Sequence, residues 1–200
     1  MKRIIIFLIL SISIKISAQN KIQNLKAQYD ETGDGFYDNR MWVQKNEKWG
    51  FIDRTGKIIV PLIYDGARRF YDGVAVVVLK DKYGFIDTSG KVVISLIYDG
   101  AKNLDQGLAL VMKNGKCGMI NKKGKVTVPI IYDHIFDFYN DRARVEKNNK
   151  SGYIDKKGTI VIPILYSYAS DFFEEKAFVG LKKEEGNFPI DKNGKRLKQD

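Results

Sequence analysis

Glycine recurs at intervals of 34 residues through most of the chain, at Gly50, Gly84, Gly118, Gly152 and Gly186. The residues after these glycines are also alike, as Phe51-Ile52-Asp53 and Phe85-Ile86-Asp87 illustrate. A fixed period of this length is typical of stacked or radially arranged copies of one supersecondary unit. Such architectures mostly provide binding surfaces, so the period constrains the fold far more than it constrains the ligand.

The first 18 residues have the three parts of a secretory signal peptide. Lys2 and Arg3 form a basic start, residues 4–14 are apolar apart from two serines, and Ser17-Ala18 supplies small residues before a cleavage point. The apolar run is short for a membrane span, so we expect cleavage after Ala18 rather than an uncleaved anchor. The sequence thus predicts export to the periplasm, the cell surface or the medium, with no transmembrane segment after signal cleavage.

Charge and cysteine content restrict the class of partner. Removing Lys2, Arg3 and Lys15 lowers the formal net charge from +10 to +7, and no block of five like charges occurs in the chain. An exported protein without a basic cluster is a poor candidate for nucleic acid, whereas weak attraction to an anionic envelope surface fits. A single cysteine cannot form an internal disulfide, so stability has to come from packing.

Within each period, one column predicts a tight turn. It contains Asp or Asn, and glycine follows three residues later in every copy. The pairs are Asp53/Gly56, Asp87/Gly90, Asn121/Gly124 and Asp155/Gly158. The acidic or amide side chain can accept hydrogen bonds from the turn backbone, and glycine can take the positive φ that closes a hairpin.

The columns around this turn predict three short antiparallel strands. A β-branched triplet such as Ile58-Ile59-Val60 follows the turn, and we expect its first and third residues to face the core. Pro61 is expected to stop that strand. Tyr64 comes next, and a later strand carries the small inner residues Ala75 and Val77, which indicate close packing against a neighbouring unit.

The pattern divides the chain into a signal peptide (1–18), an N-terminal cap or entry segment (19–35) and a repeat domain (36–200). The predicted fold is all-β, with five three-stranded antiparallel units of 34 residues, the first and last atypical as expected of caps. We expect an open solenoid or superhelix, and a closed five-bladed propeller is the alternative. We also expect a monomer.

The segment Lys48-Trp49-Gly50-Phe51-Ile52-Asp53 resembles the WG repeat family of bacterial proteins, named for a Trp-Gly pair such as Trp49-Gly50. The resemblance covers about residues 36–197. The aromatic column departs from the pattern in later copies, where it reads Tyr83, Cys117, Ser151 and Glu185. The resemblance implies an all-β array that is often exported or associated with the envelope, without a shared chemistry. It favours binding over catalysis by analogy alone.

No set of residues in the sequence predicts catalysis, a metal or a cofactor. His134 has no second histidine to work with, and Cys117 occupies a position that aromatic residues fill in other copies. The acidic residues mostly belong to recurring turns, so no carboxylate pair stands apart for glycoside hydrolysis. Residues 30–35 resemble the start of a calcium loop, but the twelfth position is Met41 where Glu is needed.

The candidate binding site is a stripe of residues on the strands that carry the Ala/Val core face. Its central column contains Trp42, Val76, Leu110, Arg144 and Phe178. Exposed, this stripe would contact a partner; alternatively it is a second buried layer between units, which the lack of interleaved polar residues favours. We therefore expect a non-catalytic binding or scaffolding protein of the cell envelope that contacts protein or glycan, the alternative being an envelope hydrolase with an unrecognised active site.

Overall fold

A computed structural model of the protein describes residues 22–182 and 186–198. The predicted signal peptide, residues 1–18, lies outside the described residues. The chain divides into two compact units. The first contains the residues through Lys80 together with Ile86–Lys91, and the second contains Asp81–Phe85 together with the residues from Val92 onward.

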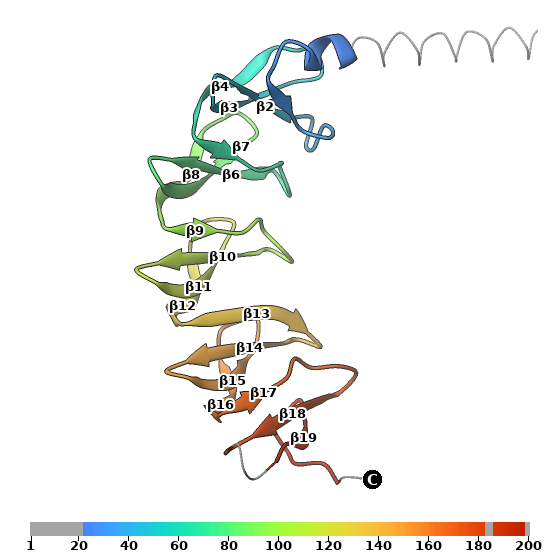
Figure 1. Ribbon diagram of the computed structural model, residues 1–200, viewed down its shortest axis with the longest axis vertical. Coiled ribbons are helices and arrows are strands. Elements are labelled where there is room, and N and C mark those ends of the chain that lie inside the picture. The colour runs from blue at the N-terminus through green and yellow to red at the C-terminus, as the bar shows by residue number, and fades with distance from the viewer. Residues whose placement is uncertain (1–21, 183–185, 199–200) are drawn as a thin grey trace, which may run out of the picture. The chain divides into compact units, whose positions relative to one another are not determined.

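The strands form five small antiparallel sheets (Figure 1). The first sheet contains β1 (Glu31–Thr32), β2 (Met41–Lys45), β3 (Lys48–Ile52) and β4 (Ile58–Tyr64). The second contains β5 (Gly66–Ala67), β6 (Val74–Leu79), β7 (Lys82–Asp87) and β8 (Val92–Tyr98). The third contains β9 (Gly100–Ala101), β10 (Leu108–Lys113), β11 (Lys116–Asn121) and β12 (Val126–Tyr132). The fourth contains β13 (His134–Tyr139), β14 (Arg142–Lys147), β15 (Lys150–Ile154) and β16 (Ile160–Tyr166), and the fifth contains β17 (Tyr168–Ala169), β18 (Lys176–Gly180) and β19 (Phe188–Asp191).

The predicted all-β array of five antiparallel units is confirmed, and each of its five sheets contains a strand that the sequence did not predict. After the tyrosine, the chain runs back along the Ala/Val strand long enough to pair with it, as Gly66 and Ala67 do with β6. In the first sheet this place is taken by β1, which pairs with β2. The segment 19–35, predicted as an entry segment, therefore contributes a strand to the first sheet.

The predicted Asp–Gly turn is confirmed. One carboxylate oxygen of Asp53 accepts hydrogen bonds from the backbone nitrogens of Thr55 (2.8 Å) and Lys57 (3.1 Å), and Gly56 has φ +93°. The same pair of bonds recurs at Asp87, Asn121, Asp155 and Asp191. Because these oxygens satisfy the turn backbone, they are structural groups rather than free acids.

The recurring glycine is required by a bulge in the neighbouring strand. The register between β3 and β4 shifts between the pairs Trp49↔Tyr64 and Phe51↔Val60, so extra residues of β4 lie opposite Gly50. A Cβ on Gly50 would lie 2.5 Å from the carbonyl oxygen of Val60. Only glycine leaves room for a backbone this close.

The prediction that proline ends this strand is wrong. Pro61, Pro129 and Pro163 lie inside β4, β12 and β16, which continue to the tyrosine. These strands are at the edges of their sheets and carry the bulge, and both settings tolerate a residue without a backbone N–H.

The triplet after the turn is also less buried than predicted. Its third residue faces the core, where Val60 is 1% exposed, but its first residue is open to solvent, where Ile58 is 50% exposed. The register of β3 and β4 shifts between the pairs Phe51↔Val60 and Ile52↔Ile58, so the regular alternation expected for the triplet is broken there. The same contrast recurs at Val92 and Ile94, Val126 and Val128, and Ile160 and Ile162.

The last copy departs from the 34-residue register. Val43 pairs with Gly50 in the first sheet, whereas Val179, the equivalent residue of the fifth sheet, pairs with Phe188. Gly186 instead lies before β19 with φ +73°, and a Cβ there would meet nothing within 4 Å. In the described part of this sheet no bulged strand crosses the position, so glycine is not required there.

Successive sheets pack through these turns. In the second unit, the turn at Gly124 contacts Ile94 of the preceding sheet, and Gly158 contacts Val128 in the same way. In the first unit, Gly56 instead meets Leu25, which belongs to a short helix at residues 22–26. A helix thus covers the first sheet where a strand covers each later one, as expected for the cap of a repeat array.

The open solenoid stays a prediction for the array as a whole. No sheet closes on itself among the described residues, since each has two edge strands. Solution X-ray scattering tests the prediction: an elongated particle is expected, and a near-spherical one would establish the closed propeller instead.

Candidate functional site

The predicted stripe does not form one exposed surface. Val76 is buried at 1% exposure, Trp42 and Leu110 are half-buried, and Phe178 is 47% exposed. The opposite face of the same strands is the core, as predicted, because its alanines and valines are 0–1% exposed in the second to fifth sheets. The stripe is therefore buried at Val76, as the alternative of a second buried layer requires, and it is exposed at Phe178.

Arg144, the charged member of the stripe, is bound within the protein. Its Nε donates to Asp171 at 3.0 Å, and its Nη1 donates to Glu146 at 2.6 Å. The guanidinium lies 3.4 Å from the centre of the Phe136 ring, in cation–π geometry. Three neighbours thus hold this side chain in place, which makes it a structural link between β14 and the segment at Asp171.

Replacing Val76 and Leu110 together by threonine is expected to cost about 2–3 kcal/mol of folding free energy, because apolar burial is lost and hydroxyls are buried without partners. Urea denaturation checks this by the fall in midpoint. Phe178→Thr is the control from the exposed end of the stripe, and we expect it to change the midpoint little. A double variant as stable as the wild type would show that Val76 is not buried in solution.

The aspartates that follow the tyrosine column accept hydrogen bonds from the hairpins of the repeats. Asp65 accepts from the Lys48 ammonium at 2.5 Å with one oxygen and from the backbone nitrogen of Lys80 at 2.7 Å with the other. The pattern recurs at Asp99 with Lys82 and Asn114, and at Asp133 with Lys116 and Asn148. The hydrogen bond from the lysine lowers the pKa of each of these aspartates.

These depressed pKa values predict loss of stability in acid. The folded protein keeps the three carboxylates charged to a lower pH than the unfolded chain does, so stability is present above the unfolded pKa and is lost as pH falls through the folded pKa. We expect the melting temperature to fall as pH drops below about 4. Converting Asp65, Asp99 and Asp133 to asparagine should lower the neutral-pH melting temperature and flatten this dependence; an equally steep curve would assign it to other carboxylates.

The calcium-like segment belongs to the same hairpin pattern. Tyr29-Asp30 precedes Tyr64-Asp65 by 35 residues, one more than the period. Asp30 accepts from the backbone nitrogen of Asn46 at 2.7 Å, as Asp65 accepts from Lys80. The structure therefore accounts for Asp30 by the hairpin that it holds.

His134 and Cys117 do not form a pair. His134 is exposed at the start of β13 and lies opposite Glu146. The Cys117 thiol is buried in β11, donates to the carbonyl of Asp133 at 3.6 Å, and has its pKa raised, chiefly by burial. A buried thiol with a raised pKa is a poor nucleophile, in agreement with its predicted structural role.

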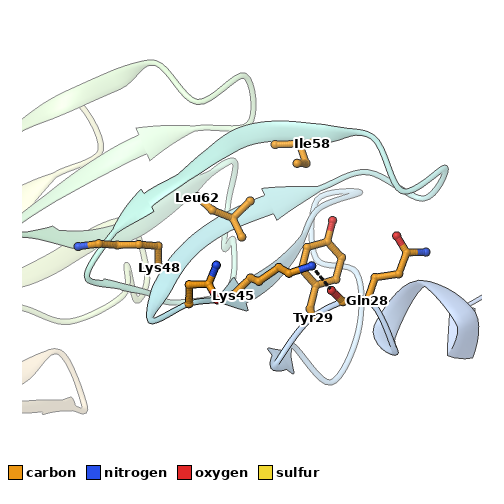
Figure 2. A pocket seen from close by; sticks show the side chains of 7 residues that line it. Gln28, Tyr29, Lys45, Lys48, Ile58 and Leu62 are labelled. Atoms are coloured by element: carbon orange, nitrogen blue, oxygen red, sulfur yellow. Dashed lines mark hydrogen bonds between the residues drawn. The ribbon is translucent and has the colours of Figure 1, made fainter.

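A pocket of about 400 Å³ opens beside the N-terminal helical turn (Figure 2). Its walls come from the segment after that turn, from the β2–β3 hairpin and from the edge strand β4. They are lined by Gln28, Tyr29, Lys45, Asn46, Lys48, Ile58 and Leu62. The sequence analysis did not predict this site; its signal is the recurring tyrosine and aspartate at Tyr29-Asp30, displaced by one residue.

The cations of this pocket already have partners. Lys45 lies along the pocket and donates to the carbonyl of Gln28 at 3.1 Å (Figure 2). Lys48 pairs with Asp65. Among the described residues that line it, the pocket therefore offers a tyrosine ring, two amides and aliphatic groups rather than a free positive charge.

A repeating exposed apolar column is the clearest surface feature that the sequence analysis missed. It lies on the edge strands, one residue before the buried tyrosine. In the second unit its members are Ile97 (46% exposed), Ile131 (41%) and Leu165 (40%), and in the first unit Ile63 is 51% exposed. Their 34-residue spacing was visible in the sequence, but the expected end of the strand at proline hid their orientation.

The chain belongs to the WG repeat family. The model of this family, described as WG containing repeat, matches five stretches, at residues 16–49, 49–83, 83–117, 118–150 and 152–183. The resemblance drawn from Trp49-Gly50 is thereby confirmed. The family copies begin earlier than the predicted start of the array near residue 36, consistent with the strand β1 in the first sheet.

Similar solved structures are distant. Virginiamycin B lyase from Staphylococcus aureus is 17% identical with a TM-score of 0.39, over 82% of this chain and 67% of the lyase. Hsv2 from Kluyveromyces lactis is 9% identical with a TM-score of 0.41, over 80% and 59%. A protein of unknown function from Bacteroides caccae is 14% identical with a TM-score of 0.29, over 82% and 78%. No curated protein matches the sequence.

The described residues contain neither a candidate membrane-spanning helix nor a candidate metal-binding cluster. None of their helices is long and apolar enough to cross a membrane. They also contain no cluster of three or more His, Cys, Asp or Glu side chains placed to hold a metal ion.

Proposed function

We propose that this WG repeat protein is a non-catalytic binding or scaffolding protein, exported to the cell envelope, that contacts another protein through its edge strands. The observation that carries the proposal is the exposed aliphatic column at Ile97, Ile131 and Leu165. Exposed apolar groups at the same position of successive 34-residue repeats are a feature of interaction surfaces. Aliphatic side chains suit a protein partner better than a glycan, whose hydroxyls need polar groups.

The same edge strands are protected against direct pairing with another strand. Pro129 and Pro163 lie at exposed positions inside β12 and β16, where they remove a backbone donor from the free edge. Proline at an edge is a common defence against edge-to-edge association. Contact through side chains, rather than through an added strand, is therefore the mode that this surface favours.

The turn and hairpin aspartates support binding over catalysis. Their oxygens accept backbone and lysine hydrogen bonds, as at Asp65, Asp99 and Asp133, so these carboxylates have a structural role. The envelope hydrolase considered from the sequence has no observation in its favour. Screens on glycan and peptide substrates test it, and turnover by the purified protein would support it.

The binding proposal is tested by capture from envelope extract with the exported protein. The variant Ile97→Ser, Ile131→Ser and Leu165→Ser removes the column in the second unit. The control Met112→Ser, Tyr139→Ser and Phe173→Ser removes three exposed apolar residues elsewhere in that unit. We expect the first variant to lose a partner that the wild type and the control retain; equal capture by all three proteins would refute the proposal.

A further inference from the structure

A small pocket in the second unit lies between the third and fourth sheets. Its volume is about 50 Å³, several times what one water molecule requires. Its apolar wall contains Leu110, Met119 and Phe138, and its polar rim contains Asn103, Asp105 and Asp137. This pocket, named the 110 slot below, is separate from the aliphatic column.

The next repeat fills the equivalent position with its own cation. One period after Leu110 comes Arg144, and one period after Asp137 comes Asp171. Arg144 donates to Asp171 at 3.0 Å. Between the fourth and fifth sheets, a guanidinium on an aliphatic stem is thus bound by the carboxylate of the following sheet, and it also contacts Glu146 and the Phe136 ring.

The 110 slot keeps the carboxylate of the following sheet, Asp137, but lacks that cation, and Met112 and Lys102 stand where the next repeat has Glu146 and Phe136. Leucine replaces Arg144, and Met119 replaces Tyr153, which is 0% exposed and donates to the carbonyl of Ser170. Both replacements lack the polar group of the side chain in the next repeat. The slot is thus the same inter-sheet position, left open, with Asp137 exposed at its mouth.

Two more features suit a cationic ligand. The Oδ1 atom of Asn103, one of the lining residues, is buried, and no hydrogen bond reaches it within the described part of the chain. Asp105 and Asp137 outnumber the single cation Lys102 among the lining residues, which leaves the slot with a net negative charge. A ligand that carries a positive charge and hydrogen-bond donors would balance this charge.

We propose that the 110 slot binds a guanidinium group on an aliphatic stem, as presented by an arginine side chain of a partner protein. The stem lies against Leu110 and Met119, and the guanidinium donates to Asp137, as Arg144 does to Asp171. This proposal is independent of the proposed function, since it concerns another surface and another chemistry.

The test uses n-butylguanidinium as the probe and the exported protein labelled with ¹³C at its methionine methyl groups. Met119 lines the slot, while Met41 is buried in the first unit and Met112 is exposed on β10. NMR titration is expected to move the Met119 signal saturably, with a dissociation constant on the order of 1–10 mM for so small a ligand. The Met41 signal should stay in place.

Three controls separate charge recognition from simple filling of an apolar space. The neutral probe n-butylurea has nearly the same shape and should bind at least about tenfold more weakly. Asp137→Asn, at an exposed position, should weaken the cationic probe by a similar factor. Leu110→Arg should occupy the slot from within and abolish the titration, while Lys102→Gln should leave it intact or strengthen it.

Each outcome decides the matter. Saturable movement of the Met119 signal that requires both the charge of the probe and Asp137 supports the proposal. Equal binding of n-butylurea, or unchanged binding by Asp137→Asn, would reduce the slot to an apolar cavity and overturn it. A Met119 signal that does not move at probe concentrations up to about 50 mM would also overturn it.

Discussion

Replacing Gly84 by valine is expected to lower the free energy of unfolding by about 3–4 kcal/mol. A Cβ at this position would lie 2.7 Å from the carbonyl oxygen of Ile94 and 2.9 Å from the Cα of Leu96. Both are backbone atoms of the neighbouring strand β8, so they cannot move aside as a flexible side chain would. The two strands would have to separate locally, with loss of their pairing.

Chemical denaturation measures this effect as a fall in midpoint at unchanged slope. Gly35→Val is the matched control, because a Cβ on Gly35 meets nothing nearer than 4.0 Å and its φ is not in the left-handed region. We expect the control to stay within about 0.5 kcal/mol of the wild type. If Gly84→Val also stayed there, the recurring glycine would be a relic of repeat duplication rather than a packing requirement.

The recurring glycine is one of the features of the fold that the sequence made visible. Its fixed spacing predicted the repeat, and the structure shows the strand whose backbone approaches it. The column Asp53 to Asp155 likewise predicted the turns, since the requirement lies within five consecutive residues. Features that depend on local hydrogen bonds of this kind recur in every copy and can be deduced from one sequence.

Features that depend on sheet edges could not be deduced in this way. Proline normally ends a strand, and Pro61 continues one only because β4 is an edge strand with a bulge. That error hid the exposed residue Ile63, which lies beyond the proline. Sequence spacing alone does not say which strand lies at an edge, because the edge is set by pairing with distant residues.

The aspartate–lysine pairs were predictable in principle. Asp65, Asp99 and Asp133 recur with the period, and so do Lys48, Lys82 and Lys116, each 17 residues earlier. Opposite charges that recur with the same period and at a fixed separation indicate ion pairs. The equivalence of Asp30 to Asp65 was missed for a different reason: one extra residue between them breaks the register on which every comparison of columns depends.

Replacing Tyr153 by alanine is expected to cost about 3–5 kcal/mol of folding free energy. Its side chain is 0% exposed and packs edge-to-face on Phe172, with ring centres 4.9 Å apart. Its hydroxyl donates to the carbonyl of Ser170 at 2.6 Å. The substitution would leave a cavity between the fourth and fifth sheets and an unsatisfied carbonyl beside it.

The chain itself supplies the control for this prediction. Phe51 occupies the same column and packs on Phe70 with ring centres 4.7 Å apart and the same 63° angle between the rings. Tyr153→Phe should therefore keep the packing and lose only the hydrogen bond, at a cost of about 1 kcal/mol. Thermal and urea denaturation of both variants separate the two contributions. Equal losses would mean that the hydroxyl, and not the ring, holds these two sheets together.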